Sequence, residues 1–211
     1  MPRALASRRR AVSALGLLLQ ITLITVGVFL GLLADEWREG RQERALADST
    51  LQRFRVEVAA NREAVQAVLT YHRDLRDRVS LFVESSSPKS FQAFMTQTQF
   101  GGIRPVIFEE SAWDIAVATG SLGYIDSELA FEISRTYTAQ TKLELMQQTF
   151  AQSSLAPATF AAPDLTGLGI TMAAYLTDVT RQEPQILEHY AALTAALDDA
   201  VGPAAPSDSV D

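Results

Sequence analysis

The hydrophobic pattern of the chain begins with an uninterrupted apolar stretch at residues 11–34. It contains no charged residue, and 17 of its 24 residues are Ala, Val, Leu, Ile or Phe. As a helix it would be about 36 Å long at about 1.5 Å per residue, which is enough to cross a hydrocarbon core of about 30 Å. These residues are therefore predicted to form a transmembrane helix that ends before Asp35 and Glu36.

The charges on either side of this stretch predict its orientation. Residues 1–10 contain four arginines and no acidic residue, whereas residues 35–44 mix acidic and basic side chains. Because cytoplasmic flanks are enriched in basic residues, we expect residues 1–10 in the cytoplasm and the rest of the chain across the membrane. A cleavable signal peptide is the alternative. It predicts a shorter apolar run ending in a small-x-small site, but Leu32 lies two residues before Ala34.

Three features in or beside the apolar stretch bear on its contacts. Gly27 and Gly31 form a GxxxG pattern, which favours close dimers in lipid but also occurs as a smooth helix face. Gln20 can hydrogen-bond across such an interface. Trp37, just beyond the stretch, is expected to anchor the helix at the headgroup level rather than to form a binding site.

A second helical pattern follows, because residues 41–87 contain neither glycine nor proline. Apolar residues recur there with heptad spacing, which is typical of a helix that packs along one stripe. The pattern forms two seams, and eight of their ten positions are apolar. One seam consists of Leu51, Val58, Val65, His72 and Val79. The other consists of Phe54, Asn61, Val68, Leu75 and Phe82.

Two packing arrangements are compatible with this stripe. In a parallel coiled coil, Glu57 of one chain would face Arg62 of the other. In the preferred alternative the helix, at least in its half beyond Ala64, packs against helices of its own chain, because further apolar residues make the stripe wider than a two-stranded seam. These residues are Val56, Leu69, Tyr71 and Val83.

The rest of the pattern predicts four shorter helices. The first covers residues 88–99, with Ser87 as its N-cap, and the second covers 109–119, with Trp113 and Val117 facing inward and Gly120 as its C-cap. The third covers 126–152 and begins at Asp126. The last covers 168–200, and Pro184 is expected to kink or split it.

Strand-like alternation is missing from the sequence, so the predicted class is all-α. A transmembrane helix at 11–34 is followed by a helical domain at 35–200, in which a long amphipathic helix leads into a helical bundle. Residues 153–166 are rich in Ser, Ala and Pro and are predicted to form a linker. Residues 201–211 are predicted to be a disordered tail.

The composition and charge of the chain argue against several classes of binding and catalytic function. The 211 residues carry a net charge of −7 and include no cysteine and only two histidines, which argues against a nucleic-acid binder and against common zinc sites. The charge is uneven: +4 over residues 1–34, +1 over 35–105 and −12 over 106–211. We find no motif for a nucleophile, a phosphate loop or a dinucleotide site, so no enzyme activity, metal or cofactor is expected.

Two polar residues, Asn61 and His72, interrupt the seams. They suggest either a ligand-binding or pH-sensing cluster, or a register-setting Asn and a hydrogen-bonded core His. Together with Trp113 and Tyr137 they are the candidate residues for a ligand site or a polar core.

Several of these residues form a recognisable order. The membrane helix ends in Trp37. It is followed by Leu51, Glu57 and Asn61. A Trp-x5-Thr-Gly-x-Leu-x2-Ile block then starts at Trp113 and precedes Tyr137. Over residues 20–145 the chain resembles uncharacterised bacterial single-pass membrane proteins that share a domain of unknown function. The resemblance implies an all-helical domain outside the cytoplasmic membrane, and it brings no catalytic residues.

The expected function is that of a non-catalytic scaffold or interaction protein of the bacterial inner membrane. Its N-terminus would be cytoplasmic and its helical domain periplasmic. Its expected partners are the lipid bilayer, a second copy of the chain through the membrane helix and the stalk, and another envelope protein. The alternative is a periplasmic ligand-binding or sensing module that works with a separate membrane partner.

Overall fold

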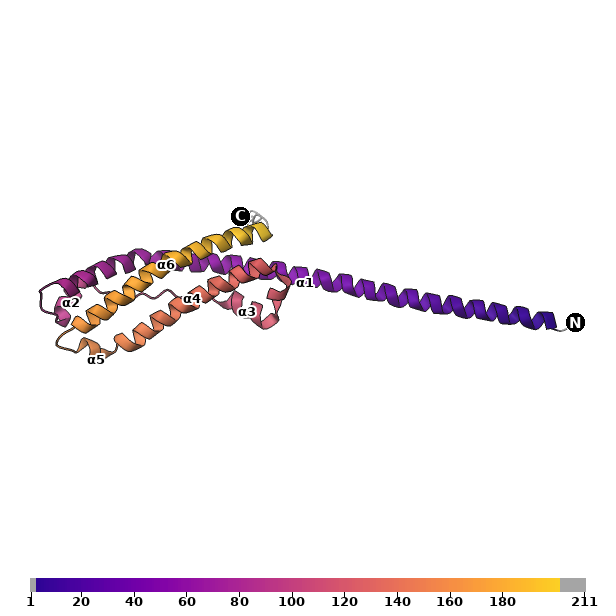
Figure 1. The fold of residues 1–211 in the computed structure, drawn as a ribbon, viewed down its shortest axis with the longest axis horizontal. Helices are drawn as coiled ribbons and strands as arrows, with labels where there is room; N and C mark the ends of the chain where they lie inside the picture. The colour runs from indigo at the N-terminus through magenta and orange to yellow at the C-terminus, as the bar shows by residue number, and fades with distance from the viewer. Residues whose placement is uncertain (1–2, 202–211) are drawn as a thin grey trace, which may run out of the picture. The chain divides into compact units, whose positions relative to one another are not determined.

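The computed structural model describes residues 3–201, with side chains from residue 16, and every regular element in this range is helical. The all-α prediction is confirmed, whereas the predicted tail at 202–211 lies outside the described residues. In chain order the elements are α1 (Arg3–Glu84), α2 (Phe91–Thr98), α3 (Ser111–Thr119), the 3₁₀ helix η1 (Ser121–Tyr124), α4 (Ser127–Ser154), α5 (Pro157–Phe160) and α6 (Thr166–Val201) (Figure 1).

The chain divides into two units, Met1–Leu46 and Ala47–Asp211. In the first unit every side chain from residue 16 to residue 39 is exposed. The large apolar side chains between residues 17 and 37 leave between 46% of their surface, at Leu33, and 73%, at Leu19, uncovered. Within the described residues, α1 is the helix that is long and apolar enough to cross a membrane.

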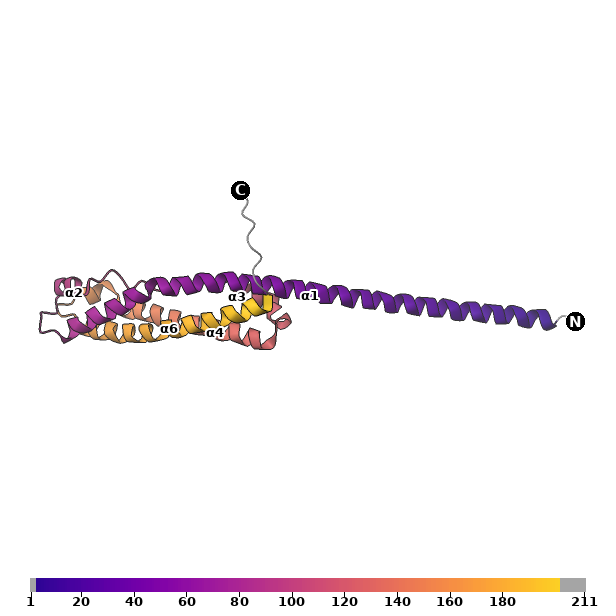
Figure 2. The same cartoon turned by 90° about the horizontal axis from the view of Figure 1, so that it is seen from above.

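The second unit is called the folded unit below and is described over residues 47–201. Its framework consists of three long helices: α1 from Ala47 onward, α4 and α6. Figures 1 and 2 show these helices lying lengthwise beside one another, and α4 and α6 are the most closely packed pair. The large side chains of the core are fully buried, among them Phe54, Phe82, Phe94, Ile133, Leu143, Met172, Leu176, Leu193 and Leu197.

The seams predicted for α1 face this core. Nine of their ten positions are buried and Val68 is half-buried, all within a single chain. Of the residues predicted to widen the stripe, Leu69, Tyr71 and Val83 are half-buried. Val56 is 70% exposed, so its assignment to the stripe is wrong. The side of α1 that carries Val56 faces away from α4 and α6, which cover only one face of α1.

The start of α2 differs from the prediction. Ser90, not Ser87, is the N-cap, and its hydroxyl accepts a hydrogen bond from the Ala93 amide at 3.3 Å. The residues before it terminate α1 instead. The Lys89 ammonium donates to the carbonyl oxygens of Phe82 and Ser85, which the end of α1 leaves without helical partners.

The inward face of α3 also differs from the prediction. Val117 is 55% exposed, whereas the buried residues of α3 are Ala112 and Ala116. Small side chains let this short helix lie close to its neighbours, so its larger residues remain at the edges. The predicted caps on either side are confirmed: Gly120 ends α3 with a φ of 69°, and Asp126 caps the start of α4.

The C-terminal half of the fold brings three further corrections. The predicted linker at 153–166 contains α5, and α6 begins at Thr166. Pro184 lies inside α6 and does not split it, because the loss of one backbone hydrogen bond is offset by the burial of nearby residues such as Val179 and Ile186. Gly169 permits a close helix contact, since a Cβ there would lie 2.9 Å from Cγ2 of Val83.

Candidate functional site

An extended segment, residues 99–110, connects α2 to α3 and is called the strap below. It runs antiparallel to α1, because its first residues contact the later part of α1. His72 contacts the Ile103 carbonyl oxygen at 2.8 Å, near the start of the strap. Asn61, which comes earlier on α1, contacts Glu109 near its end. The strap therefore lies along the two polar residues that interrupt the seams.

Side-chain amides hold the strap in place. The Asn61 amide donates to the Glu109 carbonyl oxygen at 2.8 Å and accepts from the Glu109 amide at 2.7 Å. Gln147 of α4 forms the same pair of bonds with Val106, at 3.3 Å and 2.6 Å. Buried peptide groups need partners, and the described residues supply no neighbouring strand, so these amides take that role.

The Glu57 carboxylate caps α3 from another helix. Its Oε2 atom accepts from the Ala112 amide at 2.7 Å and from the Ser111 hydroxyl at 2.9 Å. The N-cap residue of α3, Glu110, makes no side-chain cap bond of its own. A buried carboxylate at a helix N-terminus is favoured by the free amides and by the helix dipole, so Glu57 fixes α3 against α1.

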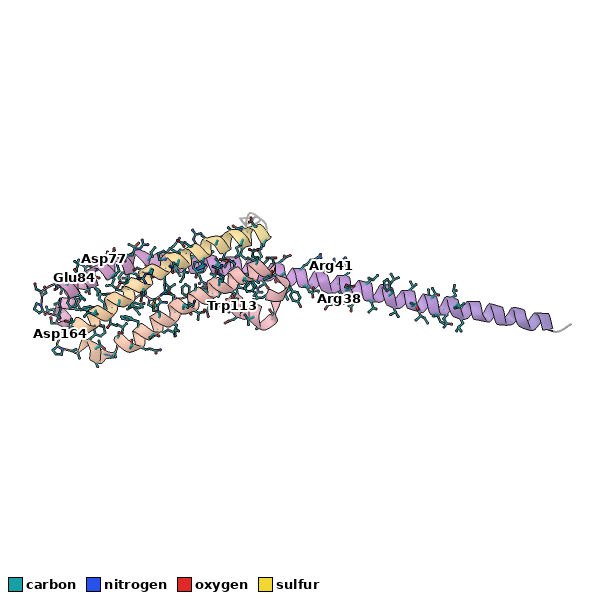
Figure 3. The ribbon with its side chains drawn as sticks, viewed as in Figure 1. Arg38, Arg41, Asp77, Glu84, Trp113 and Asp164 are labelled. Atoms are coloured by element: carbon teal, nitrogen blue, oxygen red, sulfur yellow. The ribbon has the colours of Figure 1, made fainter. Side chains whose placement is uncertain are left out.

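The other oxygen of Glu57 accepts from the Tyr137 hydroxyl at 2.5 Å. Burial, and then the hydrogen bond and charge of Glu57, raise the pKa of Tyr137 well above its usual value, so Tyr137 is the proton donor. Trp113 of α3 stacks on the Tyr137 ring with a centroid distance of 5.1 Å, and Figure 3 shows its place in the fold. Glu57 thereby joins α1, α3 and α4 at one point.

His72 forms a second buried contact with Glu183 of α6. Their Nδ1 and Oε1 atoms are 2.5 Å apart, and both side chains are fully buried. The other ring nitrogen faces the Ile103 carbonyl oxygen, so each nitrogen points at an acceptor and a doubly protonated imidazole fits. The second oxygen of Glu183 has no hydrogen-bond partner within the described residues.

The pKa of His72 reflects opposing influences. Burial is the largest and lowers the pKa, but the hydrogen bond and charge of Glu183, with the carbonyl groups of Ile103 and Arg104, raise it above the ordinary 6.5. The positive form of His72 therefore holds the strap to α1 and α6 at once.

The four candidate residues do not converge on one ligand site. Asn61, Trp113 and Tyr137 gather around Glu57 and the start of α3, while His72 lies further along the strap. Each has a partner inside the fold, which agrees with the interpretation of Asn61 and His72 as structural polar residues. Sequence reasoning missed Glu57 and Glu183 as buried groups. For Glu183 a signal was available, since it shares helical spacing with apolar residues of α6: Leu176, Val179, Ile186 and Tyr190.

Two of the hollows on the outside of the folded unit are relevant to binding. One, of about 360 Å³, lies between α1 and α3 and is lined by the exposed side chains Val56 and Ile115 above Glu57. The other, of about 580 Å³, lies between α4 and α6. Across the part of the chain that the structure describes, three or more His, Asp or Glu side chains nowhere gather in a way that could hold a metal ion.

Gln20, Gly27 and Gly31, in the part of α1 that is apolar enough to cross a membrane, are exposed in the single chain. A Cβ added to either glycine would meet nothing within 4 Å. Trp37 is 64% exposed, and Arg41, labelled in Figure 3, places its guanidinium 3.8 Å from the centre of the Trp37 ring. An amphipathic ring beside a cation suits the headgroup level.

Comparison of the chain with family models, with curated proteins and with solved structures finds no match.

Proposed function

We propose that this chain is a non-catalytic interaction protein of a bacterial inner membrane. Its apolar N-terminal helix anchors it, its first ten residues are cytoplasmic, and the folded unit is a periplasmic helical bundle. The chain self-associates through its membrane helix and presents the outer surface of the folded unit to another envelope protein.

One observation carries this proposal: the polar residues that were candidates for a ligand site have partners within the folded unit. Asn61 and His72 hold the strap, and Tyr137 holds Glu57. These three side chains therefore do not form an open ligand site, as expected of a protein that acts by contact with others through its surface. The sensing alternative has less support, because its candidate residues already have partners.

The exposed apolar surface of α1 supports the anchor. Leu19, Leu23 and Leu32 each leave more than 60% of their surface uncovered in the single chain. Such a surface is stable in lipid and costly in water. The arginines of residues 1–10, which precede the apolar stretch, support a cytoplasmic N-terminus.

Cysteine labelling tests the location, because the chain contains no cysteine of its own. Ser86→Cys, at an exposed position after α1, is expected to react with a membrane-impermeant maleimide once the outer membrane is opened. Ser7→Cys is expected to react only after the inner membrane is also permeabilised. The reverse pattern would contradict the orientation, and a mature chain lacking residue 7 would show a cleaved signal peptide instead.

Self-association is tested at the two glycines of the membrane helix. The double variant Gly27→Ile, Gly31→Ile is expected to weaken dimers in lipid vesicles about tenfold, as measured by energy transfer between labelled chains. Neither new side chain meets an atom of the same chain within 4 Å of its Cβ, so the loss would report on a second helix. The control Phe29→Leu changes the opposite side of the helix, and an equal loss there would refute the glycine interface.

A further inference from the structure

The hollow between α4 and α6 is a groove whose walls differ in charge from the rest of residues 106–211, which are called the acidic half of the chain below. Residues 106–211 carry 15 acidic and only three basic side chains. Two of those three, Arg135 and Lys142, line the groove together with His189. None of the described residues that line it is acidic. Glu132, beside the groove, lies 3.3 Å from Arg135 and 3.9 Å from His189, so the positive charge that the groove offers to a ligand is that of Lys142 and the remaining donors of Arg135.

Its positive groups have donors to spare. Lys142 is exposed and forms no ion pair with any described residue. Arg135 is 66% exposed and reaches Glu132 through one terminal nitrogen at 3.3 Å, which leaves further N–H groups of its guanidinium available. An exposed pair of this kind contributes little to stability, so the fold does not require these cations here.

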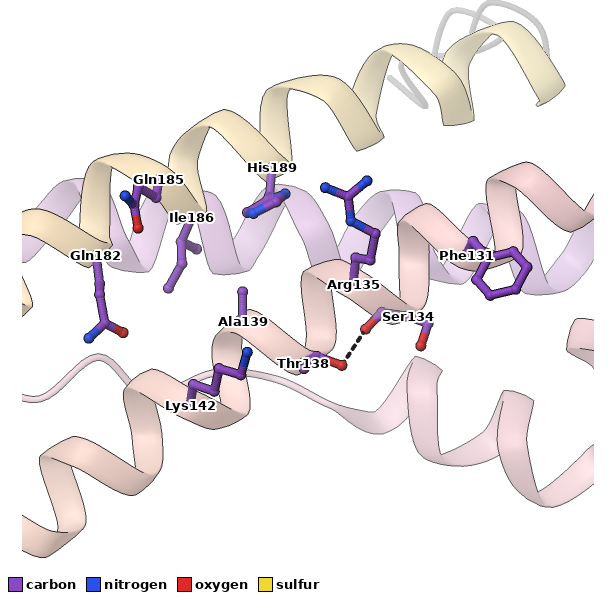
Figure 4. Close-up of a pocket in the computed structure, with 10 residues that line it drawn as sticks. All are labelled: Phe131, Ser134, Arg135, Thr138, Ala139, Lys142, Gln182, Gln185, Ile186 and His189. Carbon is purple, nitrogen blue, oxygen red and sulfur yellow. Dashed lines mark hydrogen bonds between the residues drawn. The ribbon is translucent and has the colours of Figure 1, made fainter.

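The spacing of the cations indicates the shape of a ligand. Arg135 and Lys142 are seven residues apart on one face of α4, which is about 10 Å along the helix axis. Ala139 of α4 and Ile186 of α6 point toward each other across the groove, and Arg135 and His189 extend from opposite walls (Figure 4). The groove thus offers two separate positive sites and an apolar floor.

We infer that this groove binds an acidic amphipathic helix of a partner protein. Two carboxylates seven residues apart on that helix lie on one of its faces and match Arg135 and Lys142, and an apolar side chain between them packs over Ala139. Charge complementarity selects this partner over the many acidic surfaces that lack the spacing. The inference rests on the proposed function, since it specifies the partner.

Site-specific photo-crosslinking of the full-length chain in its own membranes tests this inference. A photoreactive residue replaces Thr138, which is exposed on the groove wall. The double variant Arg135→Gln, Lys142→Gln is expected to lower the yield of the crosslinked product about tenfold. Mass spectrometry of that product is expected to find a helical segment of another protein with two acidic residues seven positions apart.

Arg181→Gln is the matched control. Arg181 is the third basic residue of the acidic half, is 65% exposed and pairs with Asp178 three residues before it at 3.2 Å, as Arg135 pairs with Glu132. It does not line the groove. The control is expected to change the yield less than twofold. Equal losses in the two proteins, an unchanged yield in the double variant, a partner segment without acidic residues, or capture of a second copy of this chain would each overturn the inference.

A second crosslinking position separates this inference from the proposed function. Ile115 lies in the hollow between α1 and α3, away from the groove. Capture of a partner from Ile115 but not from Thr138 would overturn the groove and leave the interaction function standing. Capture from neither position would overturn both.

Discussion

Glu57→Ala is expected to lower the free energy of unfolding of the folded unit by about 4 kcal/mol. The change removes the acceptor of three hydrogen bonds, from Tyr137, Ser111 and the Ala112 amide. Each buried donor left without a partner costs about 1–3 kcal/mol, and α3 also loses its cap. Glu57→Gln keeps the shape and one acceptor, so about half of the loss is expected.

Urea unfolding of the full-length chain in detergent micelles measures this effect. The chain has two tryptophans, so a Trp37→Phe background leaves Trp113, stacked on Tyr137, as the reporter. Glu63→Ala, at an exposed position on the same helix, is the control and is expected to change stability by less than about 0.5 kcal/mol. Similar losses for Glu57→Ala and Glu63→Ala would show that Glu57 does not hold α3.

The stability of the folded unit is also expected to decrease as the pH rises through the folded-state pKa of His72. This pKa is raised above 6.5, so the folded protein binds the proton more tightly than the unfolded chain does. The resulting stabilisation is complete below pH 6.5 and is lost as the pH passes the folded-state pKa. Between the two pKa values the free energy of unfolding is expected to fall by about 1.4 kcal/mol per pH unit.

Glu183→Gln tests the origin of this pH dependence. Without the carboxylate, burial dominates and the pKa of His72 is expected to fall below its ordinary value, so the decrease with rising pH disappears. At pH 6 the variant is expected to be about 3 kcal/mol less stable, because His72 must either stay charged without its partner or release its proton on folding. NMR titration of the two histidines together with urea unfolding from pH 5.5 to 8.5 measures both effects. His189→Asn, a change at the groove, is the control, and a wild-type slope in Glu183→Gln would contradict the assignment.

The parts of this fold that depend on local pattern were predictable. The seams of α1 follow from the spacing of apolar residues along one helix, and the Gly120 and Asp126 caps follow from the conformations that these residues favour. The predictions for Val56 and Val117 were wrong because an apolar side chain does not by itself show which side of its helix the neighbouring helices cover. That choice depends on the positions of the other helices.

Of the two partners in each polar contact, at most one could be recognised from the sequence. Asn61 and His72 were recognisable because they interrupt apolar seams. Their contacts lie on the strap and on α6, and Glu57 contacts a tyrosine on α4 that is 80 residues away in the sequence. A glutamate on a helix is usually exposed, and the position of Glu57 three residues after Phe54 and four before Asn61 does not reveal its partners. The groove was likewise hidden, because its two walls come from different helices.

The cap that Glu57 supplies to α3 has a consequence for the order of folding. At nine residues, α3 is too short to persist alone, and its own N-cap residue forms no side-chain cap bond. It gains its cap only once α1 lies beside it, with α4 holding the second oxygen of the same carboxylate. Helical structure at Ser111–Thr119 is therefore expected to appear late, after the long helices have met, and its amides are expected to exchange hydrogen before those of the long helices.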